Sequence, residues 1–405
     1  MSNATSPLGS AQWLTQEQLL PMQQQRMSIS IGVPKEKSFQ ENRVALTPEA
    51  VSILVNNGHQ VFVETKAGEG AHFYDNDFSE AGAQIVYSPE EVFKSDVILK
   101  VAPLMEEEAE WLKPNQIIIS AIHLPTLQAS FLEKLMQKKV TALAFEYIKD
   151  GSGTFPIVRS MSEIAGNAAI LIASELLGNA QHGGGGTLLG GITGVPPAKV
   201  VVLGAGVVGE YATRTALGLG AEVKVFDNST YKLMRLQNNI GMRIYTSIIH
   251  PEILKQELST ADVAIGSIHS EAGRSKLIVT DEMVQNMKAG SVIIDVSIDQ
   301  GGCFETSELT SHNKPTFKKY DVIHYGVPNI ASRFARTASF AISNVLTPKL
   351  IKAGQFGGLE TLFQTNDGTR HGIYLYKGAV ANRHLSERFN LKYTDLDLIF
   401  SASQL

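Results

Sequence analysis

A glycine-rich turn between two apolar runs, at residues 200–227, constrains the fold of this chain more than any other feature. Gly204, Gly206 and Gly209 follow a short apolar run in the spacing G-x-G-x-x-G. A helix-like stretch comes next, and a second apolar run ends in Asp227. This order of strand, glycine turn, helix and strand predicts a parallel βαβ unit, the context in which the spacing becomes specific.

Each glycine of this unit has a mechanical role in binding a dinucleotide. Gly204 permits the tight turn, Gly206 lets a pyrophosphate approach the backbone, and Gly209 allows the helix to pack closely on the sheet. The first helical N–H groups, at Val207 and Val208, then point towards the phosphates. The alternative for this segment is a glycine-rich turn that binds no ligand.

Asp227 distinguishes between the two nicotinamide cofactors. It ends the second strand, where its carboxylate can accept hydrogen bonds from both ribose hydroxyls. A 2′-phosphate in the same place would meet a negative charge. The sequence therefore predicts NAD rather than NADP.

Composition bounds the class of protein. A chain of 405 residues exceeds a single ordinary core, so we expect two large domains. The net charge of −5 argues against nucleic acid or an anionic membrane as the main partner, and no apolar run is long enough to span a membrane. The one cysteine, Cys303, excludes an intrachain disulfide and suits a reducing cytoplasm. No metal-ligand spacing is present, so no metal site is predicted.

Short β-branched runs alternate with helical patterns in two successive series, which predicts an α/β protein with two doubly wound, mostly parallel sheets. Residues 161–333 form the expected NAD-binding Rossmann domain. The tail is too short for a domain, so we expect residues 334–405 to join residues 28–160 in a discontinuous catalytic domain that binds the substrate. Residues 1–27 form an arm without a readable function. Helices are expected over Met161–Leu177 and Ala335–Leu350, and the cleft between the two domains is the expected active site.

Four polar residues stand where strands of these units should end, which is where ligands bind in open α/β sheets. Arg43 follows the first strand, and its guanidinium can grip a carboxylate with two hydrogen bonds. Lys100 ends an apolar strand, where a cation is costly unless it reaches the sheet edge or has a partner. His123 titrates near neutral pH and could transfer a proton. Asp299 faces a glycine turn near the expected nicotinamide ring, while the nearby Asp295 is expected to brace the loop.

Each of these residues also has an alternative without a catalytic role. Arg43 could be a surface arginine, Lys100 could extend its charged end to solvent, and His123 could be structural. Their common position at strand ends is what favours function over these alternatives.

Several short segments, taken in order, resemble the alanine dehydrogenases, and the likeness runs from about residue 28 to about residue 350. The alpha subunit of the proton-translocating transhydrogenases belongs to the same superfamily and is similar to this chain in part. The segments that carry the resemblance are Gly32–Glu36, Glu41–Ala45, Ile98–Val101, Met161–Gly166, the glycine turn, and Ile298–Glu305.

The resemblance implies an NAD-dependent enzyme that interconverts L-alanine with pyruvate and ammonium. Arg43 and Lys100 would hold the substrate carboxylate and carbonyl oxygen, and His123 would transfer the proton. Asp299 would position the reacting water or ammonia. The resemblance also implies a homo-oligomer, specifically a hexamer.

The same resemblance assigns residues to the cofactor. Met161, Ser162 and Asn329 match positions that line the nicotinamide side. Lys232, shortly after Asp227, could lie against the adenosine.

Two other functions remain open from the sequence. One is a catalytically silent NAD-binding subunit of a transhydrogenase. The resemblance implies that such a subunit lacks counterparts of His123 and Asp299. The other is a related amino-acid dehydrogenase of the saccharopine-forming type. Ala102, Ser160 and Ile330 depart from the familiar alanine dehydrogenase pattern, which leaves the preferred amino acid open.

Overall fold

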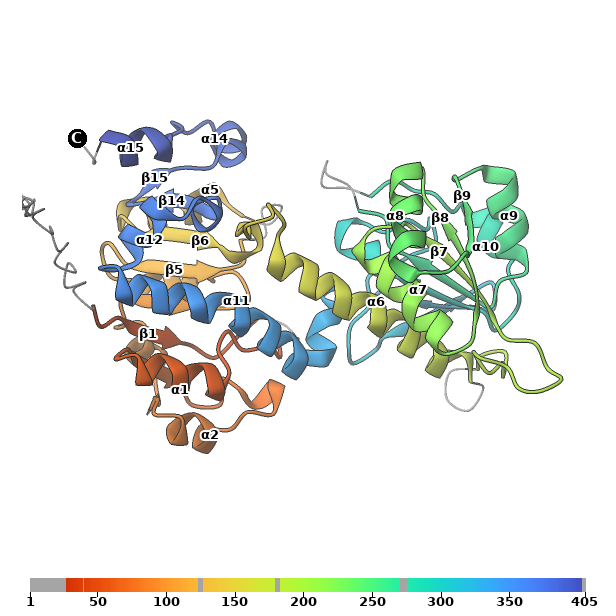
Figure 1. The fold of residues 1–405 in the computed structure, drawn as a ribbon, viewed down its shortest axis with the longest axis horizontal. Coiled ribbons are helices and arrows are strands. Elements are labelled where there is room, and N and C mark those ends of the chain that lie inside the picture. The colour runs from red at the N-terminus through yellow and green to blue at the C-terminus, as the bar shows by residue number, and fades with distance from the viewer. Residues whose placement is uncertain (1–26, 39, 123–126, 179–182, 270–274, 403–405) are drawn as a thin grey trace, which may run out of the picture.

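The computed structural model describes residues 27–38, 40–122, 127–178, 183–269 and 275–402. Within these ranges the chain forms two α/β lobes, each built around one sheet (Figure 1). The helix α6 (Pro156–Leu177) crosses from the first lobe to the second. The chain returns through η5 (Ile330–Phe334) and α11 (Ala335–Gln355), which lie against α6.

The first lobe contains a sheet in the order β15-β14-β6-β5-β4-β1-β2-β3. The strands β1 to β6 are parallel, and β14 runs antiparallel to both of its neighbours, β6 and β15. Its strands are nearly continuous apolar runs because helices cover both faces. The strands are β1 (Ser30–Val33), β2 (Gln60–Glu64), β3 (Gln84–Val86), β4 (Val97–Leu99), β5 (Ile117–Ser120), β6 (Thr141–Ala144), β14 (Ile373–Tyr376) and β15 (Ala379–Val380). The helices are α1 (Pro48–Asn56), η1 (Glu69–Ala71), α2 (Asp75–Glu80), α3 (Pro89–Val92), α4 (Glu106–Glu110), α5 (Ala129–Gln137), η3 (Phe145–Tyr147), α12 (Leu359–Thr365), α13 (Asp367–Arg370), α14 (Arg383–Phe389) and α15 (Leu396–Ala402).

The second lobe contains a sheet in the order β12-β13-β11-β10-β7-β8-β9, parallel except for β12. This order is that of a dinucleotide-binding fold with one antiparallel edge strand. The strands are β7 (Lys199–Leu203), β8 (Glu222–Phe226), β9 (Tyr245–Ser247), β10 (Val263–Gly266), β11 (Val292–Asp295), β12 (Thr316–Lys319) and β13 (Val322–Tyr325). The helices are α7 (Val207–Gly218), α8 (Thr230–Ile240), α9 (Pro251–Ser259), α10 (Asp281–Gln285) and η4 (Val296–Gln300).

The predicted fold class is confirmed, with differences in the helices that join the lobes. The helix α6 begins at Pro156, not at Met161, because a proline fits the first turn of a helix without losing a hydrogen bond. It therefore runs across the predicted boundary between residues 160 and 161. The helix α11 continues past Leu350 to Gln355, although Pro348 lies inside it. The tail adds β14 to the first sheet, beside β6.

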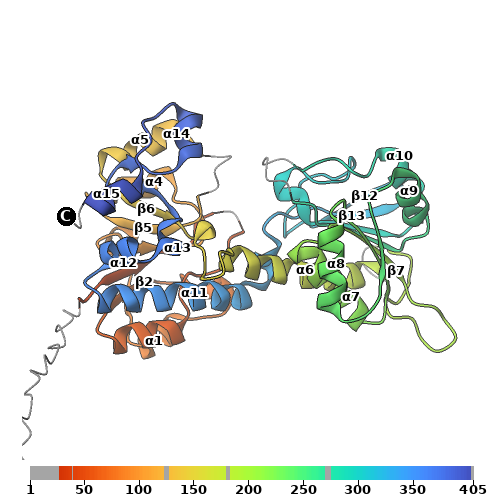
Figure 2. The same cartoon turned by 45° about the horizontal axis from the view of Figure 1, so that its top comes forward.

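Both sheets reverse their strand order next to their first strand, and this positions the site. The strand β1 lies between β2 and β4, and β7 lies between β8 and β10. A crevice opens at the carboxyl ends of the strands at such a point. Figure 2 shows α6 and α11 joining the two lobes. Among the described residues, no helix combines the length and apolar character that a membrane crossing requires.

Candidate active site between the two lobes

The glycine turn between β7 and α7 has the geometry that a pyrophosphate needs. Gly204 has φ of 106°, a left-handed conformation that favours glycine. A Cβ at Gly209 would lie 1.9 Å from the carbonyl oxygen of Gly204, so this position excludes every side chain. A Cβ at Gly206 would meet open space, which leaves the backbone accessible to a phosphate. Val207 and Val208 begin α7, so their N–H groups lie in its first turn.

Asp227 follows β8 directly, and its buried carboxylate spans the turn. Its Oδ2 accepts a hydrogen bond from the N–H of Ala205 at 2.8 Å, and its Oδ1 accepts one from Ser229 at 2.7 Å. These bonds fix the carboxylate beside the glycine turn, where ribose hydroxyls can donate to it. Lys232 is exposed in the first turn of α8, whose N-cap is Ser229. These residues fit the adenosine end of NAD.

Lys100 follows β4 and is fully buried in the first lobe. Its Nζ lies 2.7 Å from Oε1 of Glu108, in α4, and 3.2 Å from Oε2 of Glu36, which follows β1. Burial alone would lower the pKa of Lys100, but the attraction of the two carboxylates outweighs it and raises that pKa. Lys100 is therefore a protonated cation at neutral pH.

The pKa of Glu36 is raised to about 7, because the group is buried and Lys100 offsets only part of that cost. Oε1 of Glu36 accepts a hydrogen bond from the N–H of Val101 at 2.5 Å. The cluster of Glu36, Lys100 and Glu108 therefore contains one carboxyl that titrates near neutrality.

Arg43 lies in the loop after β1, and its guanidinium is held by Glu41. Nε donates to Oε1 of Glu41 at 2.7 Å, and Nη2 donates to Oε2 at 2.5 Å. The remaining terminal nitrogen, Nη1, lies 3.4 Å from Sδ of Met161 on α6. Ser162, the next residue of α6, is half-buried. A cation of the first lobe thus contacts the helix that crosses to the second.

Residues of the second lobe contact Glu41, the partner of Arg43. The side-chain amide of Asn329 donates to Oε2 of Glu41 at 3.0 Å, and its backbone N–H donates to Oδ1 of Asp299 at 3.1 Å. Asp299 lies in η4, directly after β11. Asp295 caps η4 through the N–H of Ser297, as the sequence predicts, and also accepts hydrogen bonds from Cys303, Phe304 and Ser307.

The structure therefore places Arg43, Met161, Asn329 and Asp299 in one continuous set of contacts, whereas Lys100 belongs to a separate buried cluster. His123 lies outside the described residues. No group of three or more histidine, cysteine, aspartate or glutamate side chains suited to a metal occurs in the described part of the chain.

Sequence reasoning missed the carboxylates that pair with both cations, namely Glu36, Glu41 and Glu108. Only Glu108 carried a signal, because a glutamate in the third position of a helix commonly caps it. Its Oε2 accepts a hydrogen bond from the N–H of Met105 at 2.8 Å.

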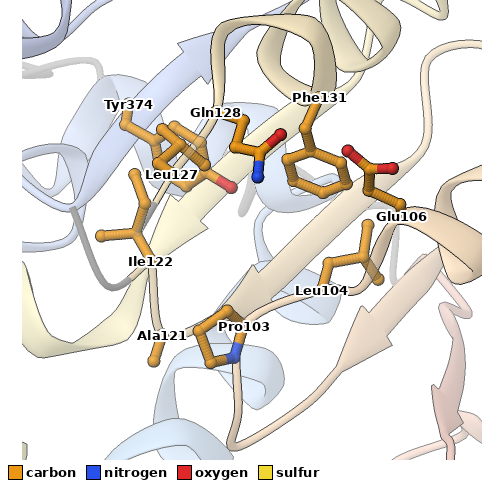
Figure 3. A pocket seen from close by; sticks show the side chains of 9 residues that line it. All are labelled: Pro103, Leu104, Glu106, Ala121, Ile122, Leu127, Gln128, Phe131 and Tyr374. Carbon is orange, nitrogen blue, oxygen red and sulfur yellow. The ribbon is translucent and has the colours of Figure 1, made fainter. Parts of the chain in front are cut away.

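A cavity of about 170 Å³ also lies beside the loops that follow β4 and β5 (Figure 3). Its wall is largely apolar, with Leu104, Ile122, Phe131 and Tyr374, and it includes the polar side chains of Glu106 and Gln128. None of the described residues that line it is a lysine or an arginine. The part of its lining that the structure describes therefore offers no counter-charge to a substrate carboxylate, unlike the site around Arg43.

Comparison with known proteins agrees with this architecture. The family models described as "Alanine dehydrogenase/PNT, N-terminal domain" and "C-terminal domain" match residues 32–165 and 169–383. Alanine dehydrogenase 2 of Staphylococcus aureus (strain USA300) is 36% identical over 370 residues, which cover 91% of this chain and 99% of that protein.

Solved structures show the same likeness. An L-alanine dehydrogenase superposes with a TM-score of 0.84 at 36% identity, covering 89% of this chain and 99% of the other. A transhydrogenase from Sinorhizobium meliloti shares the fold, with a TM-score of 0.74 at 24% identity over 88% of this chain and 99% of the other. By sequence over nearly its whole length, the chain belongs to the alanine dehydrogenase/PNT family.

Proposed function

We propose that this chain is an NAD-dependent L-alanine dehydrogenase. The reaction converts L-alanine, water and NAD⁺ into pyruvate, ammonium, NADH and one proton, and it runs in both directions. Family membership supports this activity. The observation that carries it is the contact of Arg43, a carboxylate-binding side chain of the first lobe, with Met161 of the interlobe helix, beside the Asn329 and Asp299 pair of the second lobe.

The first lobe supplies the charges that the substrate needs. Arg43 binds the carboxylate that L-alanine and pyruvate share, because a planar guanidinium matches a carboxylate with parallel hydrogen bonds. Lys100 is held protonated by two carboxylates, and it polarises the oxygen of the keto group or of the carbinolamine. His123 transfers the proton to or from that oxygen.

The second lobe holds the cofactor. When bound, NAD supplies the acceptor for the hydride that leaves the α-carbon. Gly204, Gly206 and Gly209, with Val207 and Val208, would hold its pyrophosphate, and Asp227 and Lys232 would bind its adenosine. Ser162, Met161 and Asn329 would line its nicotinamide side. Asp299 stabilises the positive charge that develops on the amino-bearing carbon and orients the water that attacks it, or, in the reverse direction, the ammonia that attacks the keto carbon.

Loss of NADH absorbance with purified protein, pyruvate and ammonium tests this function. The same assay is repeated with other 2-oxo acids in place of pyruvate and with NADPH in place of NADH. Oxidation of NADH confined to pyruvate with ammonium supports an alanine dehydrogenase. Oxidation that requires a longer 2-oxo acid and an amine would point to a saccharopine-type enzyme. A melting temperature raised by NAD, without oxidation under any condition, would point to a silent NAD-binding subunit.

Substitution of His123 tests the assigned proton transfer. His123→Ala should leave NADH binding near normal and lower turnover by about 10²-fold or more, the usual contribution of a general acid–base group. His123→Gln, which retains a polar side chain without the titrating ring, should be equally impaired. Turnover close to that of the unsubstituted protein would refute the role.

We further propose a homohexamer that resides in the cytoplasm. Large apolar side chains exposed on the second lobe support association between copies, among them Leu171, Leu188, Ile192 and Val195. A single buried cysteine, Cys303, supports a reducing compartment. Size-exclusion chromatography with light scattering measures the assembly directly, and a monomeric mass would refute the hexamer.

A further inference from the structure

Glu41 connects the two lobes at the point where the substrate carboxylate is expected. We propose that Glu41 is a positioning residue that aims the Arg43 guanidinium at the substrate and ties its orientation to the nicotinamide-side residue Asn329. This proposal rests on the function proposed above.

The first step concerns the donors of Arg43. A guanidinium carries five N–H donors in a fixed plane. Glu41 takes the edge formed by Nε and Nη2, and Met161 contacts Nη1. Among the described residues these contacts use three N–H groups, which leaves one on each terminal nitrogen. Those two N–H groups, here called the fork of Arg43, are the donors that remain for a second carboxylate.

The second step concerns what holds Glu41 itself. Its side chain is 4% exposed, and it also accepts a hydrogen bond from the N–H of Arg43 at 3.0 Å. Ser332 secures the same segment, because its Oγ accepts from the N–H of Asn42 at 3.0 Å and donates to the carbonyl of Gln40 at 2.8 Å. Residues 40–43 are thereby fastened to η5, the element through which the chain returns from the second lobe.

The third step concerns charge. Burial would raise the pKa of Glu41, but its hydrogen bonds with Arg43 and the attraction of that cation lower it below its ordinary value. Glu41 therefore stays ionised at neutral pH and offers acceptors on both oxygens. One oxygen, Oε2, serves Arg43 and Asn329 together. A glutamine has only one acceptor oxygen, so it cannot receive the full set of donors from both residues.

Glu41 and Asn329 therefore link the residues expected at the nicotinamide to the residue expected at the substrate carboxylate. Asn329 has φ of 53°, a left-handed conformation that asparagine tolerates, and it is the N-cap residue directly before η5. It binds Asp299 through its backbone and Glu41 through its side chain. A shift of this loop therefore moves Glu41, and with it the fork of Arg43.

Steady-state kinetics of the reductive direction test the proposal. The Michaelis constant for pyruvate and that for NADH are measured for the intact protein, Glu41→Gln, Glu41→Asp and the matched control Glu49→Gln. Glu49 is exposed in the first turn of α1, shortly after Arg43 in the chain. Glu41→Gln and Glu41→Asp should each raise the pyruvate constant about tenfold or more, since one loses an acceptor and the other is too short to span both partners. The NADH constant should stay within about twofold, and Glu49→Gln should change neither.

Two outcomes overturn the proposal. A pyruvate constant within about twofold of the intact protein would show that Arg43 is aimed without Glu41. Equal rises in the constants for pyruvate and NADH would show that Glu41 only supports the local structure.

Calorimetric titration of pyruvate into the NADH-saturated proteins separates this proposal from the proposed function. If the intact protein binds pyruvate but does not oxidise NADH when ammonium is added, the proposed function fails. Weaker binding by Glu41→Gln would then still support the positioning role. An intact protein that binds no 2-oxo acid would overturn both.

Discussion

Lys100 and Glu108 form a buried ion pair, with Nζ and Oε1 2.7 Å apart and neither side chain more than 1% exposed. Glu36 is the third member of the cluster. It follows β1, which is paired with β4, so it lies close to Lys100 at the end of β4. A charge held in this way depends on its partners, because an unpaired buried ion loses its hydration without compensation.

Replacement of Lys100 by methionine should therefore affect both stability and binding. We expect Lys100→Met to lower the free energy of unfolding by about 3–5 kcal/mol, the usual cost of breaking a buried pair. It should also weaken pyruvate binding by about tenfold or more, because the cation that we propose polarises the substrate oxygen is lost. Urea unfolding and calorimetric titration measure the two effects.

Lys134 provides the control for this substitution. It pairs with Glu110 on the surface, where the two side chains are 44% and 66% exposed. Lys134→Met should change the free energy of unfolding by less than about 1 kcal/mol, since exposed pairs contribute little. Unchanged pyruvate affinity in Lys100→Met would contradict the assigned substrate contact.

The raised pKa of Glu36 predicts a pH dependence of substrate binding. Below about pH 7 Glu36 is protonated, and above it the group becomes an anion. The cluster with Lys100 and Glu108 therefore gains a negative charge as the pH rises, which disfavours an anionic substrate. We expect the pyruvate dissociation constant to rise roughly tenfold through this range, and Glu36→Gln to flatten the rise.

The same group affects stability with a definite sign. The pKa of Glu36 in the folded protein lies above its ordinary value. Its contribution to the free energy of unfolding is therefore fully present when the pH is below that ordinary pKa. It is lost as the pH rises through about 7. Urea unfolding of the intact protein and Glu36→Gln between pH 5 and pH 8 measures this. Parallel pH profiles for the two proteins would contradict the raised pKa.

Much of the fold was predictable because its signals are local. The strands are short apolar runs, and Gly204, Gly206 and Gly209 mark a turn whose geometry only glycine permits at two of the three positions. Candidate residues could be found at strand ends for the same reason, since a polar side chain directly after a buried strand, such as Lys100, stands out from the sequence alone.

The partners of those residues were not predictable because they come from distant parts of the chain. Glu36 meets Lys100 only because β4 pairs with β1, and strand order cannot be read from strand sequences. Asn329 meets Glu41 only because η5 returns to the first lobe. The start of α6 at Pro156 was missed because no polar side-chain cap precedes it.

Asp227 should determine the preference for NAD. Its carboxylate accepts hydrogen bonds from the N–H groups of Ala205 and Ser229, so it is fixed beside the glycine turn. Asp227→Ala should weaken NADH binding and relax the discrimination against NADPH, since the repelling charge is lost. The ratio of kcat/KM for NADH to that for NADPH measures this. An unaltered ratio would show that another group selects the cofactor.

Asp295 should govern the loop that carries Asp299 without touching the substrate. Its buried carboxylate accepts hydrogen bonds from Ser297, Cys303 and Phe304 as well as from the Ser307 hydroxyl at 2.7 Å. Burial raises its pKa, and these bonds offset part of that rise. In Asp295→Asn one acceptor oxygen is replaced by an NH₂ group. The buried N–H groups that donated to that oxygen are then left without an acceptor.

We therefore expect Asp295→Asn to lower the free energy of unfolding by about 1–3 kcal/mol, the cost of buried donors without an acceptor. Turnover should fall as well, because η4 carries Asp299 and Asp295 is its N-cap. Asp281, a partly exposed aspartate in the first turn of α10 that pairs with Lys319, provides the control as Asp281→Asn. A loss of turnover without any loss of stability would indicate that Asp295 acts on the reacting groups directly and would refute the bracing role.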